Sequence, residues 1–265
     1  MEQTFAPVIT DIHSHLLWGL DDGPRSFGDS LRMCEIYASQ AVRTVVATPH
    51  MAHPRFDVAR DLLLHRVEQL QRACRERDIP LTILAGADVR LQPELVEMID
   101  SGRVLTIADG GAYLLLEMPP QVVPPIGDLV FQLAVQGVRP VITHPELHGG
   151  FARRPQLLVE LVQKGCLAQV TGGSLVGKFG RDARRTAERF ILDGLVHVVA
   201  SDAHSPEGHR RPDFEPLVRR LTSLVGADGA LRLLCVNPAR IVSGLSVSPC
   251  PGSEGSPVRV RTPGG

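Results

Sequence analysis

The chain has 265 residues, 43% of them hydrophobic and 22% charged, with a formal net charge of -1. This composition is typical of a globular protein with a sizeable core, and the charge excludes strong attraction to nucleic acid or an anionic membrane. No signal peptide precedes the first apolar run, and no apolar run approaches the ~18 residues of a membrane span. The scattered cysteines indicate free thiols. We therefore expect a cytoplasmic protein with no nucleic-acid partner and no membrane insertion.

Short apolar runs alternate with longer amphipathic segments from residue 8 to about residue 225. The runs are rich in Val, Ile and Leu, as is typical of strands buried on both faces: Val8–His13, Arg43–Thr48, Leu81–Ala87, Tyr113–Met118, Arg139–Thr143, Leu167–Thr171 and Val196–Ala200. The helix-like segments between them include Asp29–Ala41, Val58–Arg77 and Arg181–Asp193. This order predicts an α/β fold with a parallel sheet, either a closed barrel or a doubly wound sheet.

The C-terminal part of the chain changes character after its last helix-like segment. Residues 228–243 predict a final helix that Asn237-Pro238 interrupts. From Ser246 to Gly265 the chain is rich in Ser, Pro and Gly and has little to bury, which predicts a disordered tail over 246–265. No domain boundary is visible before the tail, so we expect one domain at residues 1–245.

Four predicted strands run directly into potential metal ligands. Residues two apart on a strand point to the same face, so His13 can converge with His15, and Asp202 with His204. His50 follows the second strand and His144 the fifth, and two more strands add carboxylates at the same level, Asp88 after the third and Glu117 in the fourth. Imidazole and carboxylate together suit borderline divalent ions such as Zn, Mn or Fe. Functional residues of a barrel collect where strands end, and the sequence predicts a metal site there.

Each of these residues taken alone has a simpler explanation. A single histidine at a strand end is more often a hydrogen-bonded structural residue, and only the joint pattern favours metal binding. For His65, inside a helix, and His197, inside a strand, solvent exposure or core packing is the better explanation. For His53, His148 and His209, in loops near the predicted site, we expect structural or supporting roles rather than ligation.

The motifs in their order along residues 8–245 resemble the polymerase and histidinol phosphatase (PHP) superfamily. The motifs are Asp11-Ile12-His13-Ser14-His15, Asp21-Asp22-Gly23-Pro24, Ala47-Thr48-Pro49-His50, Gly86-Ala87-Asp88-Val89-Arg90, Leu116-Glu117, His144-Pro145-Glu146 and Ala200-Ser201-Asp202-Ala203-His204. The Asp-Asp-Gly-Pro stretch and residues 169–174 are similar to those of the bacterial protein-tyrosine phosphatases encoded with capsule and exopolysaccharide genes. The resemblance implies the PHP fold, a distorted seven-stranded TIM-like barrel with its metal site at the C-terminal ends of the strands.

The resemblance also implies three divalent metal ions, most commonly manganese, with iron or zinc as alternatives. The implied ligands of the first ion are His13, His15, Asp88 and Asp202. Those of the second are Asp88, Glu117 and His144, and those of the third are Asp22, His50 and His204. For catalysis we predict roles for Asp22, Arg90, His144, Asp202 and Arg210.

The sequence departs from the family pattern at positions that bear on the substrate. The bridging ligand is usually Glu and here is Asp88, and Leu147 stands where an Arg usually follows His-x-Glu. A second phosphate-binding Arg corresponds to His209 or Arg210, with the alignment open by one residue. The candidate phosphate-binding cations are therefore Arg90, Lys178, Arg210 and Arg211, each of which is equally explained as a solvated surface charge.

Other phosphatase chemistries lack their residues. A cysteine-based tyrosine phosphatase needs an Arg six positions after its Cys, and the residues found there are Gln40, Pro80, Gly172, Ile241 and Ser256. No two Asp residues lie two apart, which excludes an Asp-x-Asp mechanism, and the sequence has no Gly-x-x-x-x-Gly-Lys-Ser/Thr loop that would indicate nucleotide chemistry.

Three hypotheses for function remain. We favour a metal-dependent protein-tyrosine phosphatase that acts on a bacterial tyrosine kinase regulating polysaccharide synthesis or export. A small-molecule phosphatase acting on a histidinol, sugar or nucleotide phosphate stays open because of Leu147. A metal-binding or kinase-binding module with little turnover is the third, motivated by Asp88 and Leu147 together. A homo-oligomer is compatible with each.

Overall fold

The computed structural model describes residues 8–250. Its strands are β1 (Ile9–Ser14), β2 (Val42–Ala47), β3 (His50–Met51), β4 (Thr82–Ala85), β5 (Asp88–Arg90), β6 (Tyr113–Glu117), β7 (Arg139–Thr143), β8 (Leu167–Thr171) and β9 (Val198–Ala200). Its α-helices are α1 (Phe27–Ser39), α2 (Arg60–Glu76), α3 (Leu95–Asp100), α4 (Gly127–Val135), α5 (Gly149–Arg153), α6 (Gln156–Gln163), α7 (Gly172–Leu175), α8 (Gly180–Leu192), α9 (Phe214–Leu231) and α10 (Asn237–Val242). Short 3-10 helices are η1 (Ile107–Asp109), η2 (Pro145–Leu147) and η3 (Gly208–Arg210), and η4 (Arg232–Val236) is a π-helix.

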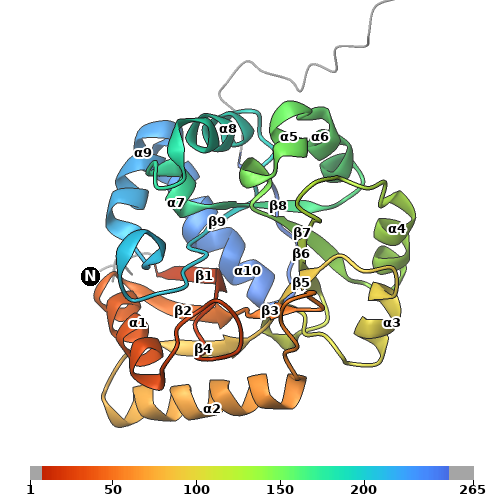
Figure 1. Cartoon of the computed structure of the whole chain (residues 1–265). Helices are drawn as coiled ribbons and strands as arrows, with labels where there is room; N and C mark the ends of the chain where they lie inside the picture. The colour runs from red at the N-terminus through yellow and green to blue at the C-terminus, as the bar shows by residue number, and fades with distance from the viewer. Residues whose placement is uncertain (1–7, 251–265) are drawn as a thin grey trace, which may run out of the picture.

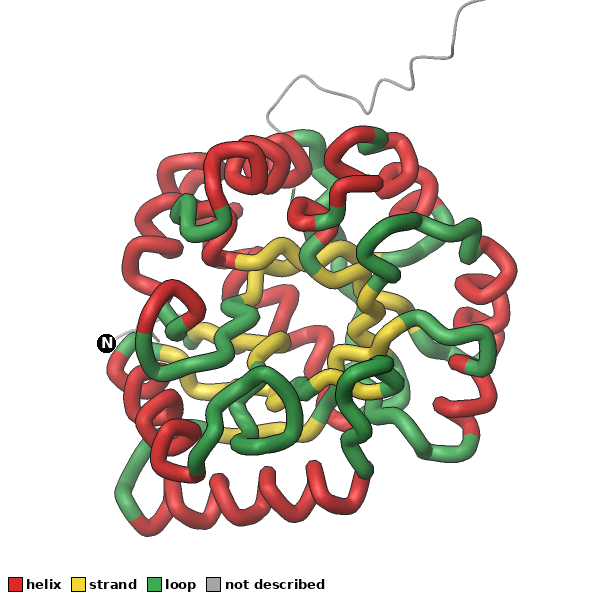
Figure 2. Tube along the Cα trace, in the orientation of Figure 1, coloured by secondary structure: helices red, strands yellow, loops and turns green. Residues whose placement is uncertain are grey.

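The strands form two sheets with every pairing parallel, which confirms the predicted α/β class. One sheet has the order β1-β2-β4 and the other the order β3-β5-β6-β7-β8-β9. Figure 1 shows the strands in the middle of the molecule, with helices around them and α10 behind their centre. The tube in Figure 2 shows loops gathered on the face toward the viewer.

The second and third predicted strands are each interrupted and followed by a short strand. β2 ends at Ala47 and β3 begins at His50, because Pro49 between them has no N–H to donate to a ladder. β4 and β5 are separated at Gly86, where an added Cβ would lie 2.7 Å from Val46 Cγ1. Only glycine permits this close approach of the two strands. The breaks place His50 opposite Asp88 as paired residues.

The two sheets approach each other at β1 and β9. Ser14 and Ala203 form an isolated parallel bridge. The His15 N–H donates to the Ala203 carbonyl (2.8 Å), and the Asp202 N–H donates to the His13 carbonyl (2.8 Å). The backbone segments that carry two predicted ligand pairs are therefore hydrogen-bonded to one another.

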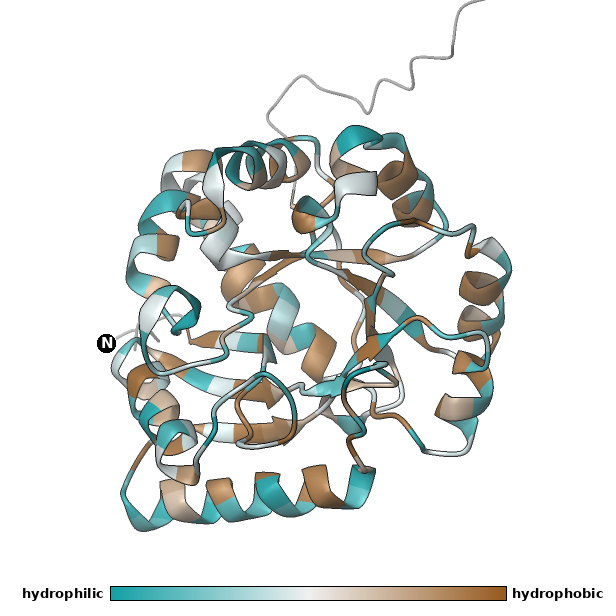
Figure 3. Cartoon of the chain, viewed as in Figure 1, coloured by the Kyte–Doolittle hydropathy of each residue, from teal (hydrophilic) through white to brown (hydrophobic). Residues whose placement is uncertain are grey.

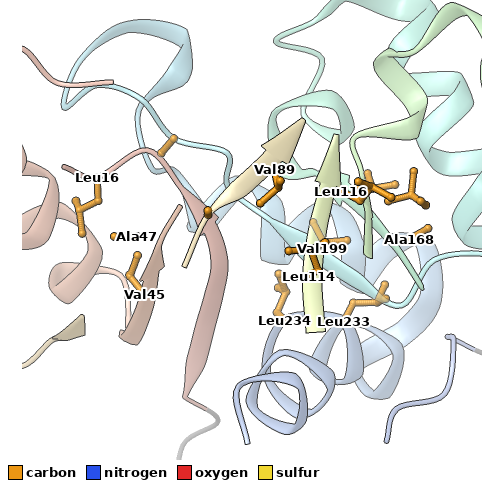
Figure 4. Packing of buried hydrophobic residues seen from close by; sticks show 14 of the residues in the cluster. Leu16, Val45, Ala47, Val89, Leu114, Leu116, Ala168, Val199, Leu233 and Leu234 are labelled. Carbon is orange, nitrogen blue, oxygen red and sulfur yellow. The ribbon is translucent and has the colours of Figure 1, made fainter. Parts of the chain in front are cut away.

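Successive residues of the central strands enter two different hydrophobic clusters. Tyr113 and Leu115 of β6 belong to the smaller cluster, whereas Leu114 and Leu116 belong to the larger one. Both faces of the sheet are thus buried, which explains the apolar runs. Figure 4 shows part of the larger cluster, with contributions from Leu16, Val45, Ala47, Val89, Leu114, Leu116, Ala168, Val199, Leu233 and Leu234. In the hydropathy colouring of Figure 3, hydrophobic (brown) segments lie in the central strands, and the surrounding helices are of mixed polarity.

The strand face that lines the smaller cluster continues into polar side chains. Leu115 is followed two residues later by Glu117, Leu167 by Gln169, and Ala200 by Asp202. Because side chains two apart share a face, the strands deliver these polar groups together, beyond the apolar layer and at their C-terminal ends.

His197 is a core histidine, as its place in the sequence suggested, although β9 begins one residue after it. Its Nδ1 accepts from the Ala168 N–H (3.2 Å), and burial lowers its pKa to about 4. The unfolded chain, with a histidine pKa of about 6.5, therefore binds more protons than the folded chain between these values. The loss of folding stability caused by burying His197 is absent above pH ~6.5 and grows as the pH falls toward 4.

We expect the free energy of unfolding to fall by about 1.4 kcal/mol per pH unit through this group between pH 6.5 and 4. The variant His197→Gln should lose that part of the pH dependence, measured by urea unfolding at several pH values. His65→Gln, which removes an exposed histidine of α2, is the matched control. Identical slopes for the His197 variant and the unmodified chain would contradict the assignment.

The start of the predicted tail lies along the body of the protein. The Asn237 amide donates to the Ser248 carbonyl (2.8 Å), and Cys250 is buried. Residues 251–265 of the tail lie outside the described residues, and the division at 245/246 stays a prediction. Among residues 8–250, no helix combines the length and apolarity needed to cross a membrane.

Candidate metal centre

His13 and His15 extend from the end of β1 into a buried cluster. Their Nε2 atoms lie 3.3 Å apart, and each lies 3.6 Å from Asp202 Oδ1. His13 Nε2 is also 3.8 Å from Asp88 Oδ2. The residues implied for the first metal ion are therefore brought together, and all four are buried.

Asp88 is shared with a second group. The His50 ring nitrogen Nδ1 lies 3.3 Å from Asp88 Oδ2 and 3.5 Å from Glu117 Oε2. Strand pairing fixes this group, since His50 pairs with Asp88 and β5 pairs with β6. The His144 ring lies 5.8 Å from the His13 ring between centroids, and His144 lines the same cavity as His50 and Glu117 without joining their group of close ligand atoms.

Asp22 lies in the loop after β1 and faces two histidines. Its Oδ1 is 3.6 Å from His50 Nε2 and 3.4 Å from His204 Nε2. The rings of His15 and His204 stack with centroids 3.7 Å apart, which joins this group to the first. His15, Asp22, His50 and His204 each offer one ligand atom within 4.8 Å of the others.

Two of the predicted ligands have a left-handed backbone conformation. His144 has φ 35° and Asp202 has φ 51°, a region that residues with a Cβ adopt at a cost of about 1–3 kcal/mol. Glu146 stabilises the first of these turns, because its Oε1 accepts from the Thr171 N–H (3.0 Å) and the Ser174 hydroxyl (2.7 Å). Strain of this kind collects at functional sites.

Asp21 and Gln169 are supporting residues that the sequence reasoning missed. The Asp21 carboxylate accepts from His15 Nδ1 (2.6 Å) and from the His50 N–H (2.9 Å). Gln169 Oε1 accepts from His13 Nδ1 (2.7 Å). The two bonds from ring nitrogens set the tautomers that leave Nε2 of His15 and of His13 free to bind a metal ion. A buried glutamine in an apolar strand and a doubled aspartate were the available signals.

We expect Asp21→Asn to weaken metal binding by about 10- to 100-fold, because the neutral amide no longer orients His15 or raises its basicity. Isothermal titration calorimetry of the metal-stripped protein with manganese measures the change in metal affinity. Asp128→Asn, at an exposed aspartate of α4, is the control and should bind as the unmodified chain does. Equal affinity in both variants would exclude the orienting role.

A buried network under the first group joins β1, α1 and the end of β9. The Tyr37 hydroxyl lies 2.9 Å from Asp11 Oδ2 and 2.8 Å from both Ser14 Oγ and Ser201 Oγ. The Asp11 Oδ1 atom accepts from the Ser201 N–H (3.0 Å). The network fixes β1 against the Ser201–Asp202 turn, next to the isolated bridge between Ser14 and Ala203.

The candidate phosphate-binding cations have different surroundings. Arg210 lies against the ligand cluster, with Nη1 3.2 Å from Asp22 Oδ2 and Nη2 3.5 Å from Asp202 Oδ1. Arg90 pairs with Glu117 Oε1 (2.9 Å) and donates to the Met118 carbonyl (2.9 Å). Lys178 pairs with Asp213 (3.3 Å), and Arg211 is exposed. Arg90 and Arg210 therefore both contact predicted ligands, and Arg210 contacts two of them.

The histidines of the surrounding loops make structural contacts. The His148 Nδ1 atom accepts from the Gly150 N–H at the start of α5, and its Nε2 donates to the Pro119 carbonyl. The His53 ring stacks on His50 with centroids 4.8 Å apart, and burial together with the charge of His50 lowers its pKa to about 4. His209 is exposed, with its ring edge toward Phe179.

The cluster holds acidic side chains and histidines close together and largely out of water, which shifts their pKa values. Burial opposes charge on His50, but the Asp88 carboxylate outweighs it and raises the pKa of His50 to about 9. Burial and the adjacent Asp88 raise the pKa of Glu117 to about 7. Burial lowers the pKa of His144 to about 4, and it lowers the pKa of His15 as well, helped by the neighbouring His204. Shifts of this size mark functional sites.

The donor atoms fit divalent cations. Both carboxylate oxygens of Asp88, Glu117 Oε2 and His50 Nδ1 are buried without a hydrogen-bond partner in the described chain. Buried polar atoms are otherwise nearly always hydrogen-bonded, and a group of such atoms calls for an ion. Mixed nitrogen and oxygen donors with several carboxylates match manganese, iron or zinc.

A cavity of about 410 Å³ opens onto these ligands. Its wall includes the cluster residues His50, Glu117, His144 and Asp202 together with Arg210. Around them lie Met118, Pro120, Leu147, His148, Phe179 and His209. Through this cavity an anion could pass from solvent to metal ions bound in the cluster, and Arg210 would lie beside it.

Comparison with known proteins decides the family. Residues 9–243 match the family described as capsular polysaccharide synthesis, CpsB/CapC. The chain belongs to the CpsB/CapC family. Relatives include the tyrosine-protein phosphatase YwqE of Bacillus subtilis, 35% identical over 74% of this chain and 77% of that protein. CpsB of Streptococcus pneumoniae, also named a tyrosine-protein phosphatase, is 27% identical over 88% of this chain and 97% of that protein.

Solved structures agree with this assignment to the CpsB/CapC family. A chain from the crystal structures of YwqE and CpsB, described as unique metal-dependent tyrosine phosphatases, matches with a TM-score of 0.87 at 31% identity. The match covers 92% of this chain and 98% of that chain. A lactonase from Listeria monocytogenes matches with a TM-score of 0.58 at 13% identity, which shows a shared fold alone.

Proposed function

We propose that this chain is a metal-dependent protein-tyrosine phosphatase. The observation that carries the proposal is the convergence of predicted ligands from several strand ends on one cluster, where Asp88 leaves both of its buried carboxylate oxygens unpartnered. Relatives in the CpsB/CapC family that bear the name tyrosine phosphatase support the substrate class.

The ligands divide into three overlapping groups, and we propose one divalent ion for each. His13, His15, Asp88 and Asp202 would hold the first. Asp88, Glu117 and His144 would hold the second, with His50 close to the same carboxylates. Asp22, His50 and His204 would hold the third, with His15 within reach. Manganese is our choice of metal, with iron and zinc as alternatives.

When bound, divalent ions polarise phosphate oxygens and make water a better nucleophile at neutral pH. The chain supplies the positioning. Asp21 and Gln169 orient His15 and His13, and Arg90 fixes Glu117. Arg210 is placed to donate to phosphate oxygens and to offset the charge that develops on them. The phenol of tyrosine, with a pKa of about 10, leaves with less help from a general acid than an alkyl alcohol needs.

We extend the proposal to the fold and the biological setting. Ser14 of β1 forms a parallel bridge with Ala203, just after β9, and β3 and β5 follow directly on β2 and β4, which supports one distorted seven-stranded barrel made from both sheets. Membership of a capsular polysaccharide family supports a tyrosine kinase of polysaccharide synthesis or export as the substrate protein. A cytoplasmic location follows from such a partner.

The test compares substrates for one metal-stripped preparation resupplied with manganese. A phosphotyrosine peptide, the same peptide with phosphoserine, and histidinol phosphate are each offered at equal concentration. We expect manganese-dependent phosphate release that is fastest from phosphotyrosine. Turnover of histidinol phosphate alone would favour the small-molecule phosphatase. Absence of turnover with metal bound would favour the binding module instead.

A further inference from the structure

We propose that Phe179 is a specificity-determining residue, which together with Leu147 forms an apolar rim for the aromatic ring of the substrate. Aryl phosphates would then be preferred over alkyl phosphates by the shape and chemistry of the cavity. The inference rests on the proposed function, because it places a ring relative to a phosphate at the metal centre.

The cavity has two chemically different parts. Its floor consists of the ligand side chains His50, Glu117, His144 and Asp202 with Arg210; His50 and Asp202 are buried and the other three are half-buried. Its rim carries the exposed Pro120, Leu147 and His209 and the half-buried Phe179, and the buried Met118 and His148 also line the cavity. Leu147 is 38% exposed, a large apolar side chain facing solvent beside a charged site. Exposed apolar area of this kind is stabilised when a ligand covers it.

Phe179 is held in place by two neighbours. It lies between α7 and α8, and a Cβ added to Gly173 of α7 would lie 2.7 Å from Phe179 Cε2. The ring therefore packs against the backbone of α7, at a position that only glycine leaves open. The ring also lies near His209 in a T-shaped arrangement, with centroids 6.2 Å apart and planes at 77°. A ring fixed in this way is a ready partner for a second ring.

Substrate chemistry matches this arrangement. In phosphotyrosine an aromatic ring separates the phosphate from the peptide backbone, whereas phosphoserine has a single methylene there. With the phosphate on the polar floor, the tyrosyl ring reaches the level of the rim. Neither Phe179 nor Leu147 carries a group that could bind metal or transfer a proton, so contact with an apolar part of the substrate is the role left to them in this cavity.

Binding of non-hydrolysable phosphonates to the manganese-loaded protein tests the inference apart from turnover. Dissociation constants of phenylphosphonate and methylphosphonate are measured for the unmodified chain and for Phe179→Ala. We expect the variant to weaken phenylphosphonate by roughly tenfold and to leave methylphosphonate almost unchanged. Leu147→Ala and Gly173→Ala, which displaces the ring, should act in the same direction.

Phe131→Ala is the matched control, because this phenylalanine of α4 is 71% exposed and does not line the cavity. Equal weakening of both phosphonates in Phe179→Ala, or phenylphosphonate binding no tighter than methylphosphonate in the unmodified chain, would overturn the inference. Selective phenylphosphonate binding without hydrolysis of any aryl phosphate would support the ring site and refute the proposed function, so the two failures are distinguishable.

Discussion

Replacing Asp88 with asparagine is expected to lower kcat/KM for a phosphotyrosine peptide by about three orders of magnitude or more. Asp88 is fully buried, and its Oδ2 faces both His13 Nε2 (3.8 Å) and His50 Nδ1 (3.3 Å). Losing this shared carboxylate removes charge from two ligand groups at once, and metal assistance contributes several kcal/mol to such reactions. Steady-state hydrolysis of the phosphotyrosine peptide with manganese present measures kcat/KM.

The Asp88 experiment has two controls. Asp88→Glu restores the carboxylate with one more methylene and should keep metal binding. Asp128→Asn, at an exposed position, should keep full activity. Metal content measured on each protein separates a lost ligand from a misfolded chain. An Asp88→Asn variant with near-normal activity and metal content would remove Asp88 from the site.

The second large effect is expected at Arg210. Its guanidinium lies beside Asp22 and Asp202 and lines the cavity that leads to the ligands. If it donates to phosphate oxygens as charge develops, Arg210→Ala should lower kcat/KM by about 10²- to 10³-fold. Manganese affinity should change much less, which distinguishes phosphate binding from a structural role.

Arg211→Ala provides the comparison for Arg210, since it removes the same side chain one position along the chain. Arg211 is exposed, so we expect little change in kcat/KM for Arg211→Ala. Arg210→Lys should recover part of the lost activity, because a point charge remains but the forked geometry is gone. A larger defect in the Arg211 variant than in the Arg210 variant would reverse the assignment.

The sequence predicted the parallel α/β class because buried strands leave a plain apolar signature. It also predicted which histidines and carboxylates gather, since side chains at the ends of parallel strands meet at one edge. The closed barrel stays a prediction. The breaks after Ala47 and Ala85 were missed: the first lies at Pro49, and the second depends on the contact between Gly86 and Val46 across two strands.

Residues that act through others were the hardest to find from sequence. Asp21 orients His15 across a loop, and Gln169 reaches His13 from a strand 156 residues away. Arg90 was predicted to act on phosphate, and its role there stays a prediction. Its pairing with Glu117 follows from the register of β5 and β6, in which these two residues are opposite each other. The register between two strands cannot be deduced from a single sequence.

Titration of metal-stripped protein with manganese tests the central claim most directly, with phosphotyrosine-peptide hydrolysis and bound metal recorded on the same samples. The account predicts no hydrolysis without metal and activity that rises with metal bound to the cluster, with no hydrolysis and less bound metal in a His13→Ala, Asp202→Ala double variant. Hydrolysis by metal-free protein, or full activity in that double variant, would contradict it.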